Sequence, residues 1–292
     1  MTTAIQRLPE SRERALARGY AQAIAQRRMR TLLGAVILII LIAMSARTSE
    51  VDLATLFSRI GSVGGYFDRL LTLDTGARVW SDVGEWFWGT KRWGRLLVDT
   101  LLIAYLGTLL GTVGGFCLSF VAAQNLTRSR ALRFVVRRFL EACRTVPEIV
   151  FALIFVVAFG LGALPGVLAI LIHTTGAMGK LFAEVVENID MNPVEGAAAS
   201  GASWTQTVRF AVVPQVLPNF ASYALLRFEI NVRGAAVMGF VGAGGIGQDL
   251  VEAIRKFQYS DVSAILLIII ATVMVIDLLT ERLRHRLIGA VR

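Results

Sequence analysis

Six long apolar runs dominate the chain and restrict what it can fold into. A helix needs about 20 apolar residues to cross a hydrocarbon core of about 30 Å, and in lipid its backbone must be hydrogen-bonded within the segment. The runs that reach or approach this length are Thr31–Ala46, Leu96–Ala123, Phe139–Gly160, Pro165–Ala183, Pro218–Phe240 and Val262–Leu279. Only 17% of residues are charged, whereas soluble domains have about 25%. We therefore predict an all-α membrane protein with six transmembrane helices and exclude a soluble globular enzyme.

The basic residues between the runs predict the orientation of the chain. With a cytoplasmic N-terminus, the inside segments would hold 17 Lys and Arg residues and the outside segments eight. Cytoplasmic segments carry an excess of these residues. We therefore expect a multi-pass protein with both termini in the cytoplasm. The net charge of +9 is explained by these segments, so no nucleic-acid partner is expected.

The N-terminal third divides into three segments. Residues 1–30 form a basic cytoplasmic segment, either an interfacial helix or a frayed tail. Residues 31–46 form the first span, although Ala43-Met44-Ser45 would also suit the cleavage site of a signal peptide. Residues 47–95 lie outside, and residues 96–292 form the core with five spans. The end of the outside segment is rich in tryptophan, which collects at membrane–water boundaries: Trp80, Trp86, Trp88 and Trp93.

The inside loop 184–217 contains strong helix signals. Asn192 is placed as an N-cap, a proline follows it, and Glu195 is at the third helical position, where its side chain can reach back to the cap. The short helix Pro193–Ser200 has mostly small side chains. Gly201 is a helix stop, because glycine adopts the left-handed conformation without strain.

A second helix start follows directly. Ser203 is its N-cap, with Gln206 in the reciprocal position of a capping box, and the helix should end at Pro214. Two short helices with a bend at Gly201 are therefore expected outside the hydrocarbon. A small-sided helix is suited to enter a groove in another protein; the alternative is a plain cytoplasmic loop.

The spacing of Glu195, Gly201 and Pro214 resembles the EAA loop of ATP-binding-cassette importer permeases. In that family the loop docks into a cleft of the ATPase subunit. The residues that this resemblance assigns to the coupling loop are Glu195, Gly196, Ala197, Ala198, Gly201, Ser203 and Pro214. The chain departs from the motif at Gly196, where the family usually has alanine.

Further segments resemble the phosphonate importer permease. They are Arg144-Thr-Val-Pro-Glu148, Ile172-His-Thr-Thr-Gly-Ala-Met-Gly-Lys180, Pro214-Gln-Val-Leu-Pro218, Gly239-Phe-Val-Gly-Ala-Gly-Gly-Ile-Gly247 and Phe257-Gln-Tyr-Ser-Asp261. The resemblance runs from Leu96 to the C-terminus. Relatives that carry phosphite, hypophosphite or phosphate share much of this pattern.

The resemblance implies a type I, methionine-importer-like architecture in the bacterial cytoplasmic membrane. It implies a permease subunit that pairs with a second copy of itself, two copies of an ATPase subunit that bind ATP and magnesium, and a periplasmic or lipid-anchored substrate-binding protein. This chain would bind no cofactor and catalyse no reaction itself. The alternatives are a permease of the same family for another small solute such as phosphate, or a secondary transporter.

Ionisable residues inside the predicted spans are candidates for a translocation pathway, because such residues face a bundle interior or a wet cavity. Glu229 and Arg233 are four residues apart and can neutralise each other. Pro147 should break the third span and free backbone groups nearby. The pathway candidates are Arg144, Glu148, His173, Arg227 and Asn231. The alternative for each charge is an internal ion pair that fixes helix packing.

Two glycine patterns predict close packing rather than chemistry. Gly107, Gly111 and Gly115 form a stripe that lets another helix approach, within one subunit. Gly242–Gly247 fits a dinucleotide-binding pattern but follows an apolar helix, so we expect a tight outer turn. The sequence has no phosphate-binding G-x-x-x-x-G-K-[ST] motif and no Cys/His spacing typical of a metal site. We therefore expect neither a catalytic site nor a metal site.

Overall fold

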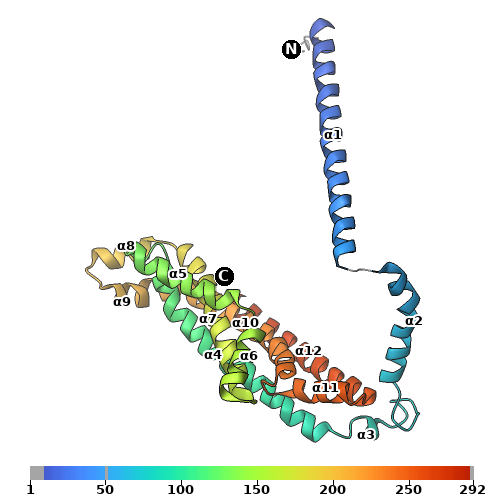
Figure 1. Cartoon of the computed structure of the whole chain (residues 1–292). Helices are drawn as coiled ribbons and strands as arrows, with labels where there is room; N and C mark the ends of the chain where they lie inside the picture. The colour runs from blue at the N-terminus through green and yellow to red at the C-terminus, as the bar shows by residue number, and fades with distance from the viewer. Residues whose placement is uncertain (1–9, 50–51, 290–292) are drawn as a thin grey trace, which may run out of the picture. The chain divides into compact units, whose positions relative to one another are not determined.

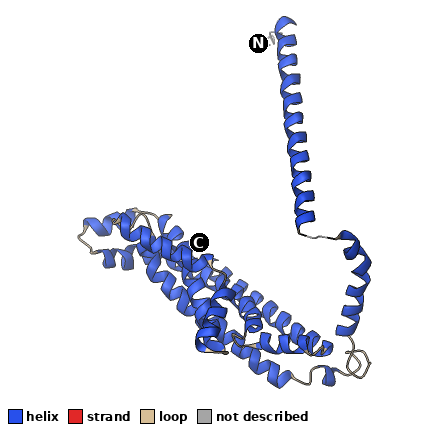
Figure 2. Cartoon of the chain, viewed as in Figure 1, coloured by secondary structure: helices blue, strands red, loops and turns tan. Residues whose placement is uncertain are grey.

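The computed structural model describes residues 10–49 and 52–289. Within these residues every regular element is a helix (Figures 1 and 2). The α-helices are α1 (Glu10–Thr48), α2 (Leu53–Leu70), α3 (Val83–Trp86), α4 (Thr90–Ala122), α5 (Arg130–Thr145), α6 (Glu148–Phe159), α7 (Ala163–Glu187), α8 (Asn192–Ala199), α9 (Trp204–Thr207), α10 (Val213–Met238), α11 (Ile246–Arg255) and α12 (Tyr259–Gly289). A π-helix, η1 (Val208–Val212), joins α9 to α10, and a 3₁₀-helix, η2 (Gly239–Val241), follows α10.

The chain divides into two compact units, residues 1–65 and residues 66–292. The first unit holds α1, which is 39 residues long and therefore spans about 58 Å. The predicted first span lies inside α1. The described residues 10–30 continue the same helix without a break, so they do not form a separate interfacial helix; residues 1–9 of that predicted segment lie outside the described residues.

Among the described helices, four are long and apolar enough to cross a membrane: most of α1, α4, α7 and α12. Two bent pairs add two more spans if each pair crosses once, which gives the six that the sequence predicts. One pair is α5 with α6, bent by 84°, and the other is the α9–α10–η2 segment with α11, bent by 46°. The predicted break of the span Phe139–Gly160 is confirmed: α5 ends at Thr145 and α6 begins at Glu148, because Pro147 has no N–H to continue the helix.

Helices α4 and α7 pack together at the centre of the second unit. A Cβ added at Gly107 would lie 2.7 Å from Ile170, and one at Gly111 would lie 2.6 Å from Thr174. A Cβ at Gly115 would lie 2.7 Å from the backbone of Gly179. These glycines therefore allow the two backbones to approach, which confirms the predicted close packing within one chain.

The segment after α10 forms the predicted tight turn. Gly242, Gly244 and Gly245 have φ angles of +82°, +87° and +81°, which only glycine adopts readily. The Ile246 backbone N–H then donates to Thr100 Oγ1 at 2.9 Å and attaches the start of α11 to α4.

The four tryptophans of residues 80–93 differ in exposure: Trp80 and Trp88 are exposed, Trp86 is half-buried and Trp93 is buried. Trp93 is only 2% exposed, and Trp86 Nε1 donates to Ser263 Oγ at 2.9 Å. Trp88 Nε1 donates to Asp261 Oδ1 at 2.9 Å. Trp93 therefore packs inside the unit that begins at residue 66, and the location of these tryptophans at a membrane–water boundary stays a prediction.

Candidate functional site

The first helix of the loop 184–217, α8, begins one residue earlier than the sequence predicts. Met191 is its N-cap, and the Met191 carbonyl accepts the Glu195 N–H at 2.9 Å. Asn192 is already helical, and its N–H donates to Asp190 Oδ1 at 3.0 Å. The prediction that Asn192 is the N-cap is wrong, because the Asp190 side chain serves as the acceptor before this helix.

The C-terminus of α8 has the backbone geometry that the sequence predicts. Gly201 has a φ of +82°. The Gly201 N–H donates to the Ala198 carbonyl at 3.0 Å, and the Ala202 N–H donates to the Ala197 carbonyl at 3.1 Å. These two bonds define a Schellman motif. A Cβ at Gly201 would have nothing within 4 Å, so this position requires glycine for its φ angle and not for space.

The second helix of the loop starts as predicted but does not stop at Pro214. Ser203 is the N-cap of α9, and its N–H donates to Gln206 Oε1 at 2.8 Å. Beyond α9 the chain forms the π-turn η1, in which the Val213 N–H bonds to the Val208 carbonyl, and then enters α10 directly. The extra residue of a π-turn accommodates a proline that would otherwise break the helix. The loop therefore continues without interruption into α10, which belongs to one of the two bent candidate spans.

The inner face of the loop is fixed to the helix bundle. Val194 and Val212 are 7% and 0% exposed, in an apolar cluster with Phe120 and Phe220. Gln215 at the start of α10 holds the segment between α7 and α8, since its side-chain amide accepts from the Asp190 N–H at 3.1 Å and donates to the Asp190 carbonyl at 3.2 Å.

The outer face of the loop is small and exposed. Its exposed residues include Glu195, Gly196, Ala198 and Gly201, while Ala197 is half-buried. A Cβ at Gly196 would have nothing within 4 Å. One carboxylate on a nearly bare helix, with its backbone fixed from behind, is a shape that can enter a groove of another protein.

A second arrangement joins three of the predicted pathway residues inside the helix bundle. Glu148 is the first residue of α6, His173 lies on α7 and Arg227 lies on α10. Arg227 Nη2 lies 2.5 Å from His173 Nδ1 and 3.7 Å from Glu148 Oε2. His173 Nδ1 lies 3.8 Å from the same Glu148 oxygen. Because a guanidinium only donates, His173 accepts through Nδ1 and is neutral in this arrangement.

Thr174 positions Arg227 and Asn231. Its hydroxyl accepts from Arg227 Nε at 3.4 Å and from Asn231 Nδ2 at 2.9 Å. Asn231 is completely buried and also donates to Thr108 Oγ1 at 2.8 Å. Asn231 therefore links α4, α7 and α10, which is the geometry of a packing contact.

Three further charged residues lie near the predicted pathway. Arg144 is exposed in the last turn of α5. Glu229 and Arg233 form the predicted pair, with Arg233 Nη2 2.6 Å from Glu229 Oε1. Arg233 also lies 3.6 Å from Asp277.

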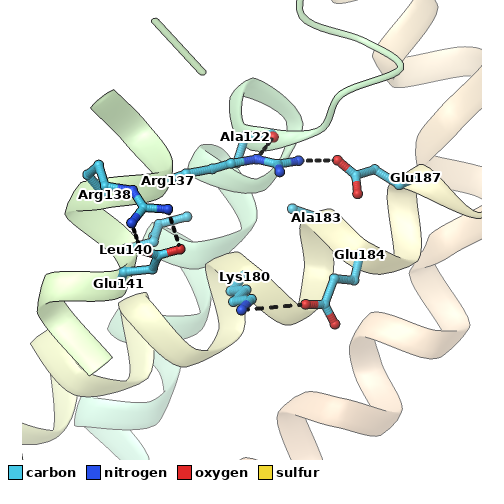
Figure 3. Close-up of a pocket in the computed structure, with 9 residues that line it drawn as sticks. All are labelled: Ala122, Arg137, Arg138, Leu140, Glu141, Lys180, Ala183, Glu184 and Glu187. Carbon is cyan, nitrogen blue, oxygen red and sulfur yellow. Dashed lines mark hydrogen bonds and ion pairs between the residues drawn. The ribbon is translucent and has the colours of Figure 1, made fainter. Parts of the chain in front are cut away.

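Sequence reasoning missed a charged pocket between α5 and α7, which Figure 3 shows. Arg137 is paired with Glu187, and its Nε donates to the Ala122 carbonyl at 2.9 Å, at the C-terminus of α4. Arg138 lies 2.6 Å from Glu141 on the same helix. The amphipathic charge pattern of residues 130–145 is the sequence feature that could have indicated this pocket. Because its arginines form ion pairs with nearby carboxylates, we interpret this pocket as a structural contact that holds the ends of the helices together.

A family model matches residues 115–292 of this chain. It describes a binding-protein-dependent transport system inner membrane component. The matched range includes both the loop with α8 and α9 and the cluster of Glu148, His173 and Arg227.

Two curated relatives are similar to part of this chain. The phosphite transport system permease protein PtxC of Stutzerimonas stutzeri is 46% identical over 198 residues, which cover 68% of this chain and 72% of the relative. The putative cryptic phosphonate transport system permease protein PhnE2 of Escherichia coli is 51% identical over 121 residues, which cover 41% of this chain and 99% of the relative.

The fold is also found in a solved structure. A chain of the inward-facing MetNI methionine ABC transporter superposes with a TM-score of 0.59 at 20% identity, covering 67% of this chain and 95% of that chain. At this identity the likeness shows the fold alone. It confirms the methionine-importer-like architecture that the sequence resemblance implies.

Proposed function

Since this chain belongs to the family of binding-protein-dependent transport system inner membrane components, we propose that it is the permease subunit of an ATP-driven importer for phosphonate-type anions. The cargo class is phosphonate, phosphite or a related phosphorus oxyanion, as in the names of the two relatives. The chain would lie in the bacterial cytoplasmic membrane with both termini in the cytoplasm, as the distribution of Lys and Arg favours.

The observation that carries this proposal is the construction of the loop around α8 and α9. Its outer face is small and exposed, its bend is fixed by the φ of +82° at Gly201, and η1 joins it without interruption to α10. Residues 193–214 would dock into a separate ATPase subunit, and a displacement of α8 would pass directly into a membrane-spanning helix.

The energy for transport would come from partners. Two ATPase subunits would bind ATP and magnesium, and a periplasmic or lipid-anchored binding protein would deliver the anion. Because each chain has one such loop, two copies of this chain would serve two ATPase subunits. ATP would draw the two loops together and open the outer side, and hydrolysis would return the pathway to face inward. This chain would position the cargo and catalyse nothing itself.

The pathway would pass the charged cluster in the bundle. An anionic cargo requires positive potential at membrane depth, and Arg227 supplies it next to His173. Arg144 is exposed at the C-terminal end of α5, where it would attract the anion to the same region.

Reconstitution tests the proposal. Proteoliposomes with this chain, its ATPase and its binding protein should import phosphite or methylphosphonate only when ATP is supplied on the ATPase side. ATP-independent import driven by an ion gradient would instead indicate a secondary transporter. Labelling of a cysteine at position 198 from the non-cytoplasmic side would place the loop on the wrong face and contradict the proposal.

A further inference from the structure

The Glu148 carboxylate is held only loosely by its two partners. Its Oε2 lies 3.7 Å from Arg227 and 3.8 Å from His173, beyond hydrogen-bonding distance. The same buried oxygen has no hydrogen-bond partner among the described residues. A buried carboxylate of an ion pair that serves only packing is normally satisfied by hydrogen bonds.

Arg227 likewise has hydrogen-bond donors that the described contacts do not use. Of its five N–H donors, the described contacts use Nε toward Thr174 and Nη2 toward His173. Its side chain is 11% exposed, and that of Glu148 is 23% exposed. Since charged groups do not face hydrocarbon, the accessible side of this cluster must face a cavity or a second subunit.

Glu148 lies at a bend between two helices. It follows the 84° bend between α5 and α6 and is the first residue of α6. Across from it on α10 is Gly234, where an added Cβ would overlap Glu148 Oε1. The absence of a side chain at Gly234 is what gives the carboxylate its place beside Arg227.

We propose that Arg227, held in place by His173 and Thr174, forms an oxyanion-binding site within the permease and that Glu148 is a displaceable counter-ion beside it. A carboxylate and a phosphorus oxyanion present similar anionic oxygens to a guanidinium. In the described conformation Glu148 neutralises Arg227. When the tetrahedral anion arrives, it replaces the carboxylate at the free Arg227 donors, and Thr174 keeps the guanidinium in position. The cargo class in this inference rests on the proposed function.

If Glu148 is a counter-ion, loss of its charge should tighten anion binding. If Glu148 only supports packing, the same change should leave anion binding unchanged or weaken it. Without the competing carboxylate, Glu148→Gln should bind the anion about tenfold more tightly than wild type. The measurement is equilibrium binding of labelled phosphate, phosphite and methylphosphonate to the purified permease–ATPase complex in nanodiscs, without nucleotide or binding protein. The double variant Glu148→Gln/Arg227→Gln should lose this gain. A Glu148→Gln complex that binds all three anions as weakly as wild type, or more weakly, overturns the proposal.

Two further variants make the test independent of one substitution. Gly234→Ala should displace the carboxylate by steric overlap and tighten binding in the same direction, so it serves if Glu148→Gln does not assemble. Glu229→Gln removes a carboxylate from another arginine of α10 and should leave anion binding unchanged.

Import by the wild-type transporter distinguishes a failure of the proposed function from a failure of the counter-ion inference. If wild type imports none of the three anions with its binding protein and ATP, the proposed function fails. If it imports one of them and neither Glu148→Gln nor Gly234→Ala tightens binding, only the counter-ion inference fails.

Discussion

The loop with α8 and α9 and the cluster around Arg227 are built in contrasting ways. In the loop, backbone geometry determines the shape, and the exposed face of α8 carries mostly small side chains: Gly201 needs its positive φ while its surroundings are empty. In the cluster, ionisable side chains from α6, α7 and α10 determine the site, and the backbones only position them. Substitutions in the loop should therefore act through shape and docking, whereas substitutions in the cluster should act through charge.

The largest effect is expected for Gly201→Asp. A non-glycine residue at a positive φ is strained by about 1–3 kcal/mol, and the new carboxylate lies on the exposed docking face. Import should fall to background, and the ATPase should no longer co-purify with the membrane subunit.

Gly201→Asn is the matched control for that substitution. Asparagine tolerates the left-handed conformation better than most residues and adds no charge, so it should keep part of the ATPase association. If Gly201→Asp retained the ATPase and full import, the loop could not be the docking element.

The next largest effect is expected for Arg227→Gln. Loss of the positive charge should lower import about tenfold, while the ATPase still co-purifies because the loop is untouched. The measurement is uptake of labelled phosphite at equal expression, compared with Arg233→Gln, which removes a charge from the same helix. Unchanged uptake in Arg227→Gln would exclude it from the pathway.

The sequence predicts the loop better than the cluster, because the loop depends on local backbone geometry and the cluster on the packing of distant helices. The stop at Gly201, the start at Ser203 and the Glu229–Arg233 pair all depend on neighbours within a few residues, and each was predictable. The meeting of Glu148, His173 and Arg227 was not, because it depends on how three helices pack. Even locally, the end at Pro214 was predicted wrongly, since a π-turn continues the helix. Long-range packing and unusual helical turns leave little trace in a single sequence.

A smaller effect is expected for Thr174→Val, which keeps the shape of the side chain. Valine cannot accept from Arg227 Nε or Asn231 Nδ2, so two buried donors lose a partner, at about 1–3 kcal/mol each. The melting temperature of the complex should fall, and import should decrease less than in Arg227→Gln.

Thr175→Ser is the control for Thr174→Val, because Thr175 bonds only to its own helix at the Leu171 carbonyl. If Thr174→Val were as inactive as Arg227→Gln at normal stability, the threonine would contact the anion directly rather than position the arginine.

The smallest effect is expected for Gly196→Ala, which tests whether shape alone governs the loop. Gly196 is helical, and an added Cβ would have nothing within 4 Å. Alanine should stabilise α8 by up to about 1 kcal/mol, and it is the residue that the resembling family usually has here. ATPase co-purification and import should therefore stay at or slightly above the wild-type level. A strong loss of ATPase association in Gly196→Ala would show that the partner contacts this backbone so closely that even a methyl group is excluded, and the docking face would then have to be centred on Gly196 rather than on the bend at Gly201.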